Sequence, residues 1–208
     1  MERQIPRATT RTGGTMEREL LLTGIGGQGI QLAAHLLARA LAAEGRDVQL
    51  FGSYGGMMRG GSTDATLVAG DREVQSPPTV SLAWSAIVMH DAHAPALPAR
   101  LRPGGLLVRN STLCGRPGDT VPDHVVLLDL PATAIAAGLG SVAAGTLVAL
   151  GAYARATAIV GPDALERALT EVLPPYRHGA IAVNIQALHA GHSAVPEVRS
   201  PAWAGVAA

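Results

Sequence analysis

Three glycines in the sequence have the spacing of a phosphate-binding turn, since Gly24, Gly26 and Gly29 form the pattern G-x-G-x-x-G. Glycine permits positive φ angles and lets the phosphates of a ligand approach the backbone. A helix that begins at such a turn also offers free N–H groups and a positive dipole. We therefore predict a ligand-binding turn whose contacts come from Gly24, Gly26, Gly27, Gln28 and Gly29.

The segments on either side of this turn have the patterns that the motif requires. The apolar run at residues 20–23 is typical of a buried parallel strand. Apolar residues then recur at helical spacing from Ile30 to Leu41, and Gly45 supplies a stop signal. An alternative is a tight turn that only packs the helix against the sheet and binds nothing.

A dinucleotide is one candidate ligand for this turn. Such a site has an acidic residue at the end of the second strand, roughly 20 residues on, which binds the ribose. The predicted second strand, residues 48–51, is followed by Gly52 and Ser53 and carries no acid there, while Glu44 falls at the end of the preceding helix. A free-standing NAD-dependent Rossmann oxidoreductase is therefore an alternative and not the first interpretation.

A second glycine cluster follows this strand, where residues 53–62 read Ser-Tyr-Gly-Gly-Met-Met-Arg-Gly-Gly-Ser. Ligands of open α/β sheets bind beyond the carboxyl ends of the strands, and Arg59 could bind a phosphate or carboxylate there. The alternative is a solvent loop with an ordinary surface arginine. We expect this cluster, together with the residues that follow the fifth strand, to contribute Ser53, Tyr54, Gly55, Arg59, Gly60, Gly61, Asn110 and Ser111 to the same edge.

The two glycine clusters together resemble the gamma subunit, or gamma domain, of 2-oxoacid:ferredoxin oxidoreductases. The resemblance rests on residues 24–29, on Ser53-Tyr54-Gly55 and on Arg59-Gly60-Gly61, and it extends from Glu19 to Gly191. Many members of the family have Pro and Glu where this chain has Gly56 and Met57. That departure puts any acid-dependent contact of the second loop in doubt.

The resemblance implies an enzyme subunit that is not catalytic by itself. Enzymes of this family act on pyruvate, branched-chain 2-oxoacids, 2-oxoglutarate or indolepyruvate, and they decarboxylate the 2-oxoacid oxidatively to an acyl-CoA. Thiamine diphosphate, Mg2+ and the 4Fe-4S clusters are expected on the alpha, beta and delta partners, and ferredoxin accepts the electrons. The gamma chain is expected to pack on the thiamine diphosphate core and to help bind coenzyme A. A non-catalytic nucleotide-binding module is a further alternative.

Other residues with reactive side chains give weaker patterns. His90, Asp91 and His93 form H-D-x-H after the fourth strand, but the sequence marks no further ligand, so we expect no metal site. Cys114 is the only cysteine, and no activating base is placed beside it by sequence. We therefore assign no catalytic residue.

The order of the predicted elements indicates an α/β fold. Strands are expected at residues 20–23, 48–51, 63–69, 86–89, 106–109 and 125–128, and helices at 30–41, 92–101, 141–159, 164–173 and 178–191. Strands that alternate with helices favour a Rossmann-like, three-layer α/β/α arrangement around a mainly parallel sheet. We expect residues 1–16 to be a disordered leader, 17–192 the gamma-type domain, and 193–208 an arm that is loose or docks through Trp203 on a partner.

Composition narrows the classes of function. The charged fraction is only 15%, which favours a surface partly covered by a partner, although an alanine-rich composition would also lower it. Sixteen basic and 16 acidic residues cancel without a basic stripe, which argues against nucleic acid. No apolar run reaches the length of a membrane span and no signal-peptide pattern is present, so we expect a cytoplasmic protein without a membrane partner.

Overall fold

The computed structural model describes residues 15–54, 61–93, 97–115 and 121–203, with the side chains of residues 53, 54 and 93 left undescribed. The strands are β1 (Glu17–Ile25), β2 (Asp47–Tyr54), β3 (Ser62–Gly70), β4 (Ala83–Val88), β5 (Leu101–Asn110) and β6 (Val126–Leu130). The α-helices are α1 (Ile30–Ala43), α2 (Ala132–Gly138), α3 (Gly145–Thr157), α4 (Pro162–Val172) and α5 (Ile181–Ser193). Short 3-10 segments are η1 (Asp91–His93), η2 (Pro98–Arg100), η4 (Val142–Ala144) and η5 (Pro175–Ala180).

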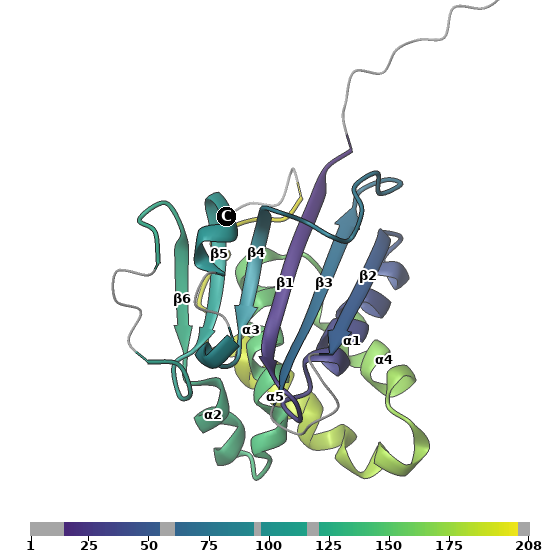
Figure 1. Cartoon of the computed structure of the whole chain (residues 1–208). Helices are drawn as coiled ribbons and strands as arrows, with labels where there is room; N and C mark the ends of the chain where they lie inside the picture. Colours follow the sequence, from purple (N-terminus) through teal and green to yellow (C-terminus); the bar gives the residue numbers. More distant parts are fainter. Residues whose placement is uncertain (1–14, 55–60, 94–96, 116–120, 204–208) are drawn as a thin grey trace, which may run out of the picture.

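The six strands form one sheet in the order β2-β3-β1-β4-β5-β6 (Figure 1). The pairings of β1 with β4, β4 with β5 and β5 with β6 are parallel. Only β3 runs against its neighbours, β1 and β2. The segment between β2 and β3 is too short for a crossover helix, which a parallel connection would need. The predicted α/β class with a mainly parallel sheet is confirmed.

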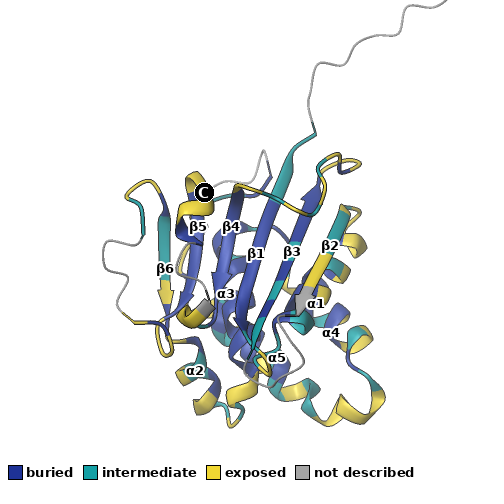
Figure 2. Cartoon of the chain, in the orientation of Figure 1, coloured by how far each residue is buried: buried dark blue, intermediate teal, exposed yellow. Residues whose placement is uncertain are grey.

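The two faces of the sheet are covered differently. One apolar cluster joins side chains of α1 to α5 to one face of the strands, and Figure 1 shows α1, α3, α4 and α5 together behind the sheet. The second cluster covers the other face and includes Leu97 and Cys114 from connecting segments and Leu101 from the start of β5. The layer on this second face is therefore made of short turns and loops. Figure 2 shows that the central strands β1, β4 and β5 are the most deeply buried part of the sheet.

The segment before β5 differs from the expected helix at residues 92–101. It contains the two 3-10 segments η1 and η2, and Leu101 already begins β5. The expected helix was wrong because Pro95 and Pro98 lack the N–H donors that a regular α-helix needs. The expected helix at residues 141–159 is likewise divided into η4 and α3.

Two glycines allow α3 and α5 to cross at close range. A Cβ added at Gly151 would overlap the backbone carbonyl of Leu188, and one at Gly191 would overlap that of Val148. Small residues in the predicted helices thus have a packing role, since they bring the two backbones into direct contact. Among the described helices, none is both long and apolar enough to span a bilayer.

The C-terminal segment packs against its own chain as far as Trp203. The Trp203 ring is 8% exposed and its Nε1 donates to the Ile159 carbonyl at 2.8 Å. The Arg46 guanidinium lies 4.2 Å from the centre of the ring, and Arg18 Nε donates to the Ala202 carbonyl at 2.6 Å. Trp203 is thus an anchor, and the surface on which it docks belongs to the same chain.

Candidate functional site

The two glycine clusters meet at the edge where β1 ends, as the sequence predicted. The register pairs Ile25 with Ser62, and the Gly26 N–H donates to the Gly61 carbonyl at 2.9 Å. Tyr54 ends β2 and pairs with Thr63, so both ends of the second cluster lie beside the first turn. Gly55, Arg59 and Gly60, together with the side chains of Ser53 and Tyr54, lie outside the described residues, and their contacts stay predictions.

The side chain of Gln28 closes the first turn. Its Oε1 accepts a hydrogen bond from the Ile25 N–H at 2.9 Å, and its Nε2 donates to the Met89 carbonyl at 3.4 Å. Gly24 makes room for this amide, because a Cβ at that position would lie 2.5 Å from Gln28 Oε1. The Ile25 N–H is therefore satisfied within the protein and is not free to bind a ligand.

The N–H groups of Gly27 and Gly29 lie in the turn just before α1. Their φ angles of 100° and 81° are left-handed, which glycine adopts without strain. Gly29 is the N-cap of α1. Among the described residues, none accepts a hydrogen bond from the N–H of Gly27 or Gly29. With the dipole of α1 behind them, these donors can bind an anionic oxygen.

Asn110 is buried behind this edge and makes its contacts within the protein. Its side chain is 1% exposed; Nδ2 donates to the Met89 carbonyl at 3.1 Å and to Thr133 Oγ1 at 2.9 Å. Its Oδ1 accepts from the Thr133 N–H at 3.1 Å. Ser111 is exposed beside it, and its N–H donates to the Leu130 carbonyl. The two residues do lie at the expected edge, but only Ser111 has a side chain that faces outward there.

Asp64 belongs to the same edge, and the sequence interpretation missed it. Its Oδ1 accepts from Thr23 Oγ1 at 2.5 Å and its Oδ2 from Ser62 Oγ at 2.7 Å. Gln31 Nε2 donates to the Asp64 carbonyl at 2.8 Å. The only sequence signal is an acid near the start of an apolar strand. Because both carboxylate oxygens are engaged, Asp64 fixes the start of β3 against β1.

Cys114 and His90 do not form a reactive site among the described residues. Burial raises the pKa of the Cys114 thiol from near 9.0 to about 11, which disfavours the nucleophilic thiolate. The Asp91 carboxylate accepts a hydrogen bond from the Gly115 N–H at 2.9 Å, which lowers the pKa of Asp91. Within the described part of the chain, no three His, Cys, Asp or Glu side chains are arranged to hold a metal ion.

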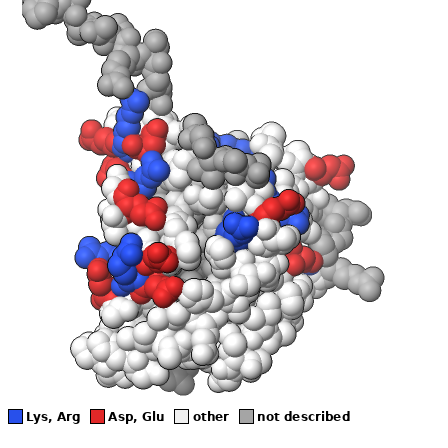
Figure 3. Space-filling view, turned by 180° about the vertical axis from the view of Figure 1, so that it is seen from behind, with Lys and Arg blue, Asp and Glu red and all other residues white. Residues whose placement is uncertain are grey.

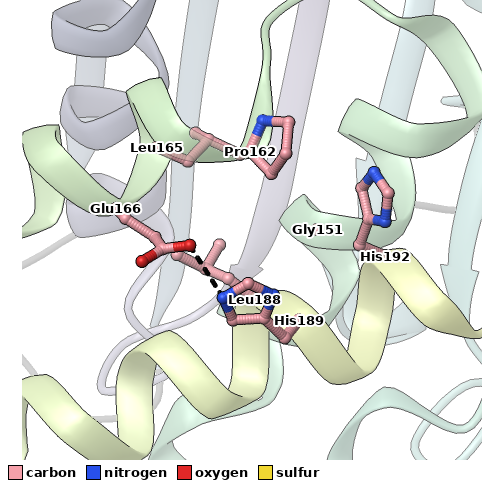
Figure 4. A pocket seen from close by; sticks show the side chains of 7 residues that line it. All are labelled: Gly151, Pro162, Leu165, Glu166, Leu188, His189 and His192. Carbon is pink, nitrogen blue, oxygen red and sulfur yellow. Dashed lines mark ion pairs between the residues drawn. The ribbon is translucent and has the colours of Figure 1, made fainter.

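A shallow pocket between α3, α4 and α5 lies away from the glycine turns (Figure 4). On its rim the Glu166 carboxylate contacts His189 Nε2 at 2.8 Å, and the two side chains point toward one another. Burial lowers the pKa of His192 on the same rim, and Arg155 and His189 add to the effect. The floor is apolar and small, so it offers few groups that could orient a substrate.

One face of the described part of the chain has a broad area without charged side chains. Seen from behind, the lower part of the molecule carries no blue or red side chains over a broad area (Figure 3). This is the end where α2 and the start of α5 lie in Figure 1. The stretch of sequence from Leu130 to Ala154 contains no Asp, Glu, Lys or Arg. Uncharged surface of this extent is typical of contact with a partner.

Comparison with known proteins gives consistent matches over most of the chain. Residues 19–194 match the family model for pyruvate ferredoxin/flavodoxin oxidoreductase. The 2-oxoglutarate synthase subunit KorC of Methanocaldococcus jannaschii is 27% identical over 186 residues, which cover 88% of this chain and 96% of that protein. The gamma subunit of the NADH-dependent phenylglyoxylate dehydrogenase of Aromatoleum evansii is 28% identical over 180 residues, which cover 85% of this chain and 93% of that protein.

Solved structures share the fold. The pyruvate oxidoreductase subunit PORC of Thermotoga maritima superimposes with a TM-score of 0.69 at 26% identity and covers 86% of this chain and 96% of its own. The gamma subunit of a keto/oxoacid ferredoxin oxidoreductase from Geobacter sulfurreducens gives 0.72 at 24% identity, covering 85% and 95%. The 2-oxoglutarate:ferredoxin oxidoreductase of Magnetococcus marinus, solved with 2-oxoglutarate, coenzyme A and succinyl-CoA, gives 0.76 at 20% identity over 89% of this chain and 33% of that one.

Proposed function

Because the chain belongs to the pyruvate ferredoxin/flavodoxin oxidoreductase family, we propose that it works as the gamma subunit of a multi-subunit 2-oxoacid:ferredoxin oxidoreductase. The complete enzyme decarboxylates a 2-oxoacid oxidatively, forms an acyl-CoA and passes the electrons to ferredoxin. In this proposal the gamma chain packs on the thiamine diphosphate core and helps to bind coenzyme A. Relatives that are themselves subunits, such as KorC and PORC, support the assignment to a subunit.

The observation that carries the coenzyme A proposal is the pair of N–H donors at Gly27 and Gly29, for which the described residues provide no acceptor. Coenzyme A has several phosphate groups, and phosphate oxygens are the ligands that a glycine turn at a helix N-terminus binds best. The second glycine cluster lies beside this turn, joined to it by the bond from Gly26 to Gly61. Arg59 of that cluster is proposed as a second phosphate or carboxylate ligand.

The redox cofactors of the enzyme are assigned to the partner subunits. A 4Fe-4S cluster is held by four cysteine thiolates, whereas this chain contains one cysteine, which is buried and has a raised pKa. Thiamine diphosphate with Mg2+ supplies the decarboxylation chemistry where it is bound. What this chain's residues offer is a charge-poor surface for the alpha, beta or delta partner and N–H donors in the glycine turn for which the described residues provide no acceptor.

The dinucleotide alternative is not favoured by the same geometry. The acid that would bind a ribose is missing from the end of β2 up to Ser53. Asp64, which the register places opposite Ser53, already accepts hydrogen bonds from Thr23 and Ser62 with its two oxygens. The Gln28 amide also uses the Ile25 N–H. Among the described residues, this edge therefore offers no unengaged carboxylate for the ribose of a nicotinamide dinucleotide.

The coenzyme A proposal is tested with Gly27→Asp and its matched control Gly27→Asn in the assembled complex. Asn and Asp tolerate left-handed φ about equally, and no atom lies within 4 Å of a Cβ at this position. Only Asp brings a negative charge next to the phosphate, which costs about 1 kcal/mol at 4 Å in water. Gly27→Asp should therefore raise the KM for coenzyme A about fivefold relative to Gly27→Asn. Equal KM values for the two variants would contradict the proposal.

The assignment to a subunit is tested by purification. We expect the chain to co-purify with partners that carry thiamine diphosphate and iron–sulfur clusters, and the isolated chain to be colourless and inactive. A lone chain that catalyses 2-oxoacid oxidation, or that carries a brown cluster by itself, would contradict the assignment.

A further inference from the structure

The side chain of Asn110 forms hydrogen bonds with three groups of the protein. It is 1% exposed, and both hydrogens of its Nδ2 are donated, to the Met89 carbonyl and to Thr133 Oγ1. Its Oδ1 accepts from the Thr133 N–H. A buried amide with its donors and acceptor engaged holds neighbouring segments in a fixed relation, because breaking any of these bonds leaves a polar group unpaired. Asn110 therefore ties the end of β5 to α2 and to the residue that follows β4.

The Met89 carbonyl connects Asn110 to the glycine turn. It accepts from Asn110 Nδ2 at 3.1 Å and from Gln28 Nε2 at 3.4 Å. The Met89 N–H donates to the Thr23 carbonyl at 2.9 Å, next to the start of the turn. Gln28 Oε1 in turn accepts from the Ile25 N–H. A continuous set of hydrogen bonds thus runs from the core at Asn110 to the backbone of the turn.

Thr146, in helix α3, forms a further hydrogen bond with Gln28. It lies in the first turn of α3, is 2% exposed, and its hydroxyl donates to the backbone carbonyl of Gln28. Gln28 is therefore fixed at its backbone by Thr146 and at its side chain by Ile25 and Met89. The residues on either side of it, Gly27 and Gly29, carry N–H groups that no described residue accepts.

We propose that Asn110 and Thr146 are positioning residues of the enzyme, which fix Gln28 so that the N–H groups of Gly27 and Gly29 stay directed outward toward the phosphates of coenzyme A. This inference rests on the function proposed above and deepens it. Glycine-rich turns are intrinsically mobile, since glycine has the largest conformational freedom to lose. Preorganising the donors removes that entropic cost from ligand binding. Neither positioning residue touches the ligand.

The test uses Thr146→Val, which keeps the shape and removes the hydroxyl, and Thr146→Ser, which keeps the hydroxyl. Loss of one buried hydrogen bond corresponds to about a threefold to tenfold change in an equilibrium constant. In the assembled complex we expect Thr146→Val to raise the KM for coenzyme A by that factor, with kcat and the KM for the 2-oxoacid within twofold of wild type. Amide exchange of the peptide spanning residues 24–29 should become faster. Thr146→Ser should restore both values.

Asn110→Asp is the second variant and acts at the other end of the same set of bonds. It is nearly isosteric but replaces the Nδ2 group, which donates two hydrogen bonds, with an oxygen. We expect it to give the same increase in the KM for coenzyme A and in the amide exchange of residues 24–29. This variant keeps the test possible even if Thr146→Val does not assemble.

The outcomes separate this inference from the function on which it rests. If Gly27→Asp raises the KM for coenzyme A while the Thr146 and Asn110 variants change neither the KM nor the exchange rate, the positioning role is overturned and the proposed function stands. If the Thr146 and Asn110 variants speed exchange in the turn but Gly27→Asp leaves the KM unchanged, the residues do position the turn and the coenzyme A proposal is overturned.

Discussion

Single residues at the edge of the sheet where β1 ends have roles that their types alone do not reveal. Gly24 fits the first position of a phosphate-binding pattern, yet in the structure it leaves room for the Gln28 amide. Asn110 has the side chain of a ligand-binding residue but is fully engaged inside the protein. In the described part of this edge, the N–H groups of Gly27 and Gly29, residues without a side chain, have no acceptor. Among the described residues, the donors without an acceptor at this edge are therefore backbone groups, and the side-chain amides of Asn110 and Gln28 are engaged within the protein.

Cys114 gives a prediction at the residue scale. Its pKa is raised to about 11 because burial disfavours the thiolate, with the Asp91 and Asp129 carboxylates adding to the effect. Because this pKa lies about two units above the ordinary value of 9.0, the thiol forms about a hundredfold less thiolate at pH 8. Iodoacetamide should therefore label native protein at least about a hundred times more slowly than urea-unfolded protein, as followed by mass spectrometry.

The same shift has a consequence for stability. Because the folded-state pKa of Cys114 lies above the unfolded value, its contribution to the free energy of unfolding is complete below pH 9.0 and is lost as the pH rises toward 11. A Cys114→Ala variant should lack this part of the alkaline decrease. Equal labelling rates in the native and unfolded states would show that the thiol is accessible and not perturbed.

Among the elements, the helices α3 and α5 pack so closely that their crossing has no room for a side chain. Both helices contribute a glycine at the crossing, and each glycine faces a backbone carbonyl of the other helix. The sequence shows these glycines inside predicted helices, where they lower helix propensity. The tertiary contact explains them, because no side chain fits between the two backbones.

Gly151→Ala and Gly191→Ala test this crossing. In each variant the new methyl group would overlap a carbonyl oxygen, so the helices must separate. Overpacking of this kind costs about 1–3 kcal/mol or more, measured by urea denaturation. Gly138→Ala in α2 is the matched control, since no atom lies within 4 Å of its Cβ. If Gly151→Ala were as stable as Gly138→Ala, the close approach of the two helices would be wrong.

On the scale of the whole molecule, the C-terminal segment closes the fold. Arg155 donates to the carbonyls of Val195 and Pro196, and the Arg199 N–H donates to the Ala156 carbonyl. Trp203 then packs into the large apolar cluster beneath Arg46. The segment thereby covers the end of α3 and links the two ends of the described chain through Arg18 and Ala202.

Trp203→Ala should destabilise the chain strongly. It removes a buried ring, its hydrogen bond to Ile159 and its stacking with Arg46, and loss of a buried Trp costs about 3–5 kcal/mol. The expected result is a lower midpoint of urea unfolding. A chain truncated after Trp203 keeps all of these contacts and should unfold like the full chain. An unchanged midpoint for Trp203→Ala would show that the segment does not dock in solution.

The sequence by itself determined the features that depend on neighbours along the chain. The strand before Gly24, the turn, the helix from Ile30 and the stop at Gly45 are local patterns, and the structure has each of them. The convergence of the two glycine clusters also follows from sequence, because both come after strands that end at one edge of the sheet.

The tertiary structure alone decided which groups at that edge are free. Thr146 and Gln28 are 118 residues apart, and Asn110 and Met89 are 21 apart, so no local pattern predicts their bonds. The docking of Trp203 on its own chain is likewise a long-range outcome. Local propensity places glycines in a turn, but only packing determines whether an N–H group in that turn is satisfied by the protein or left for a ligand.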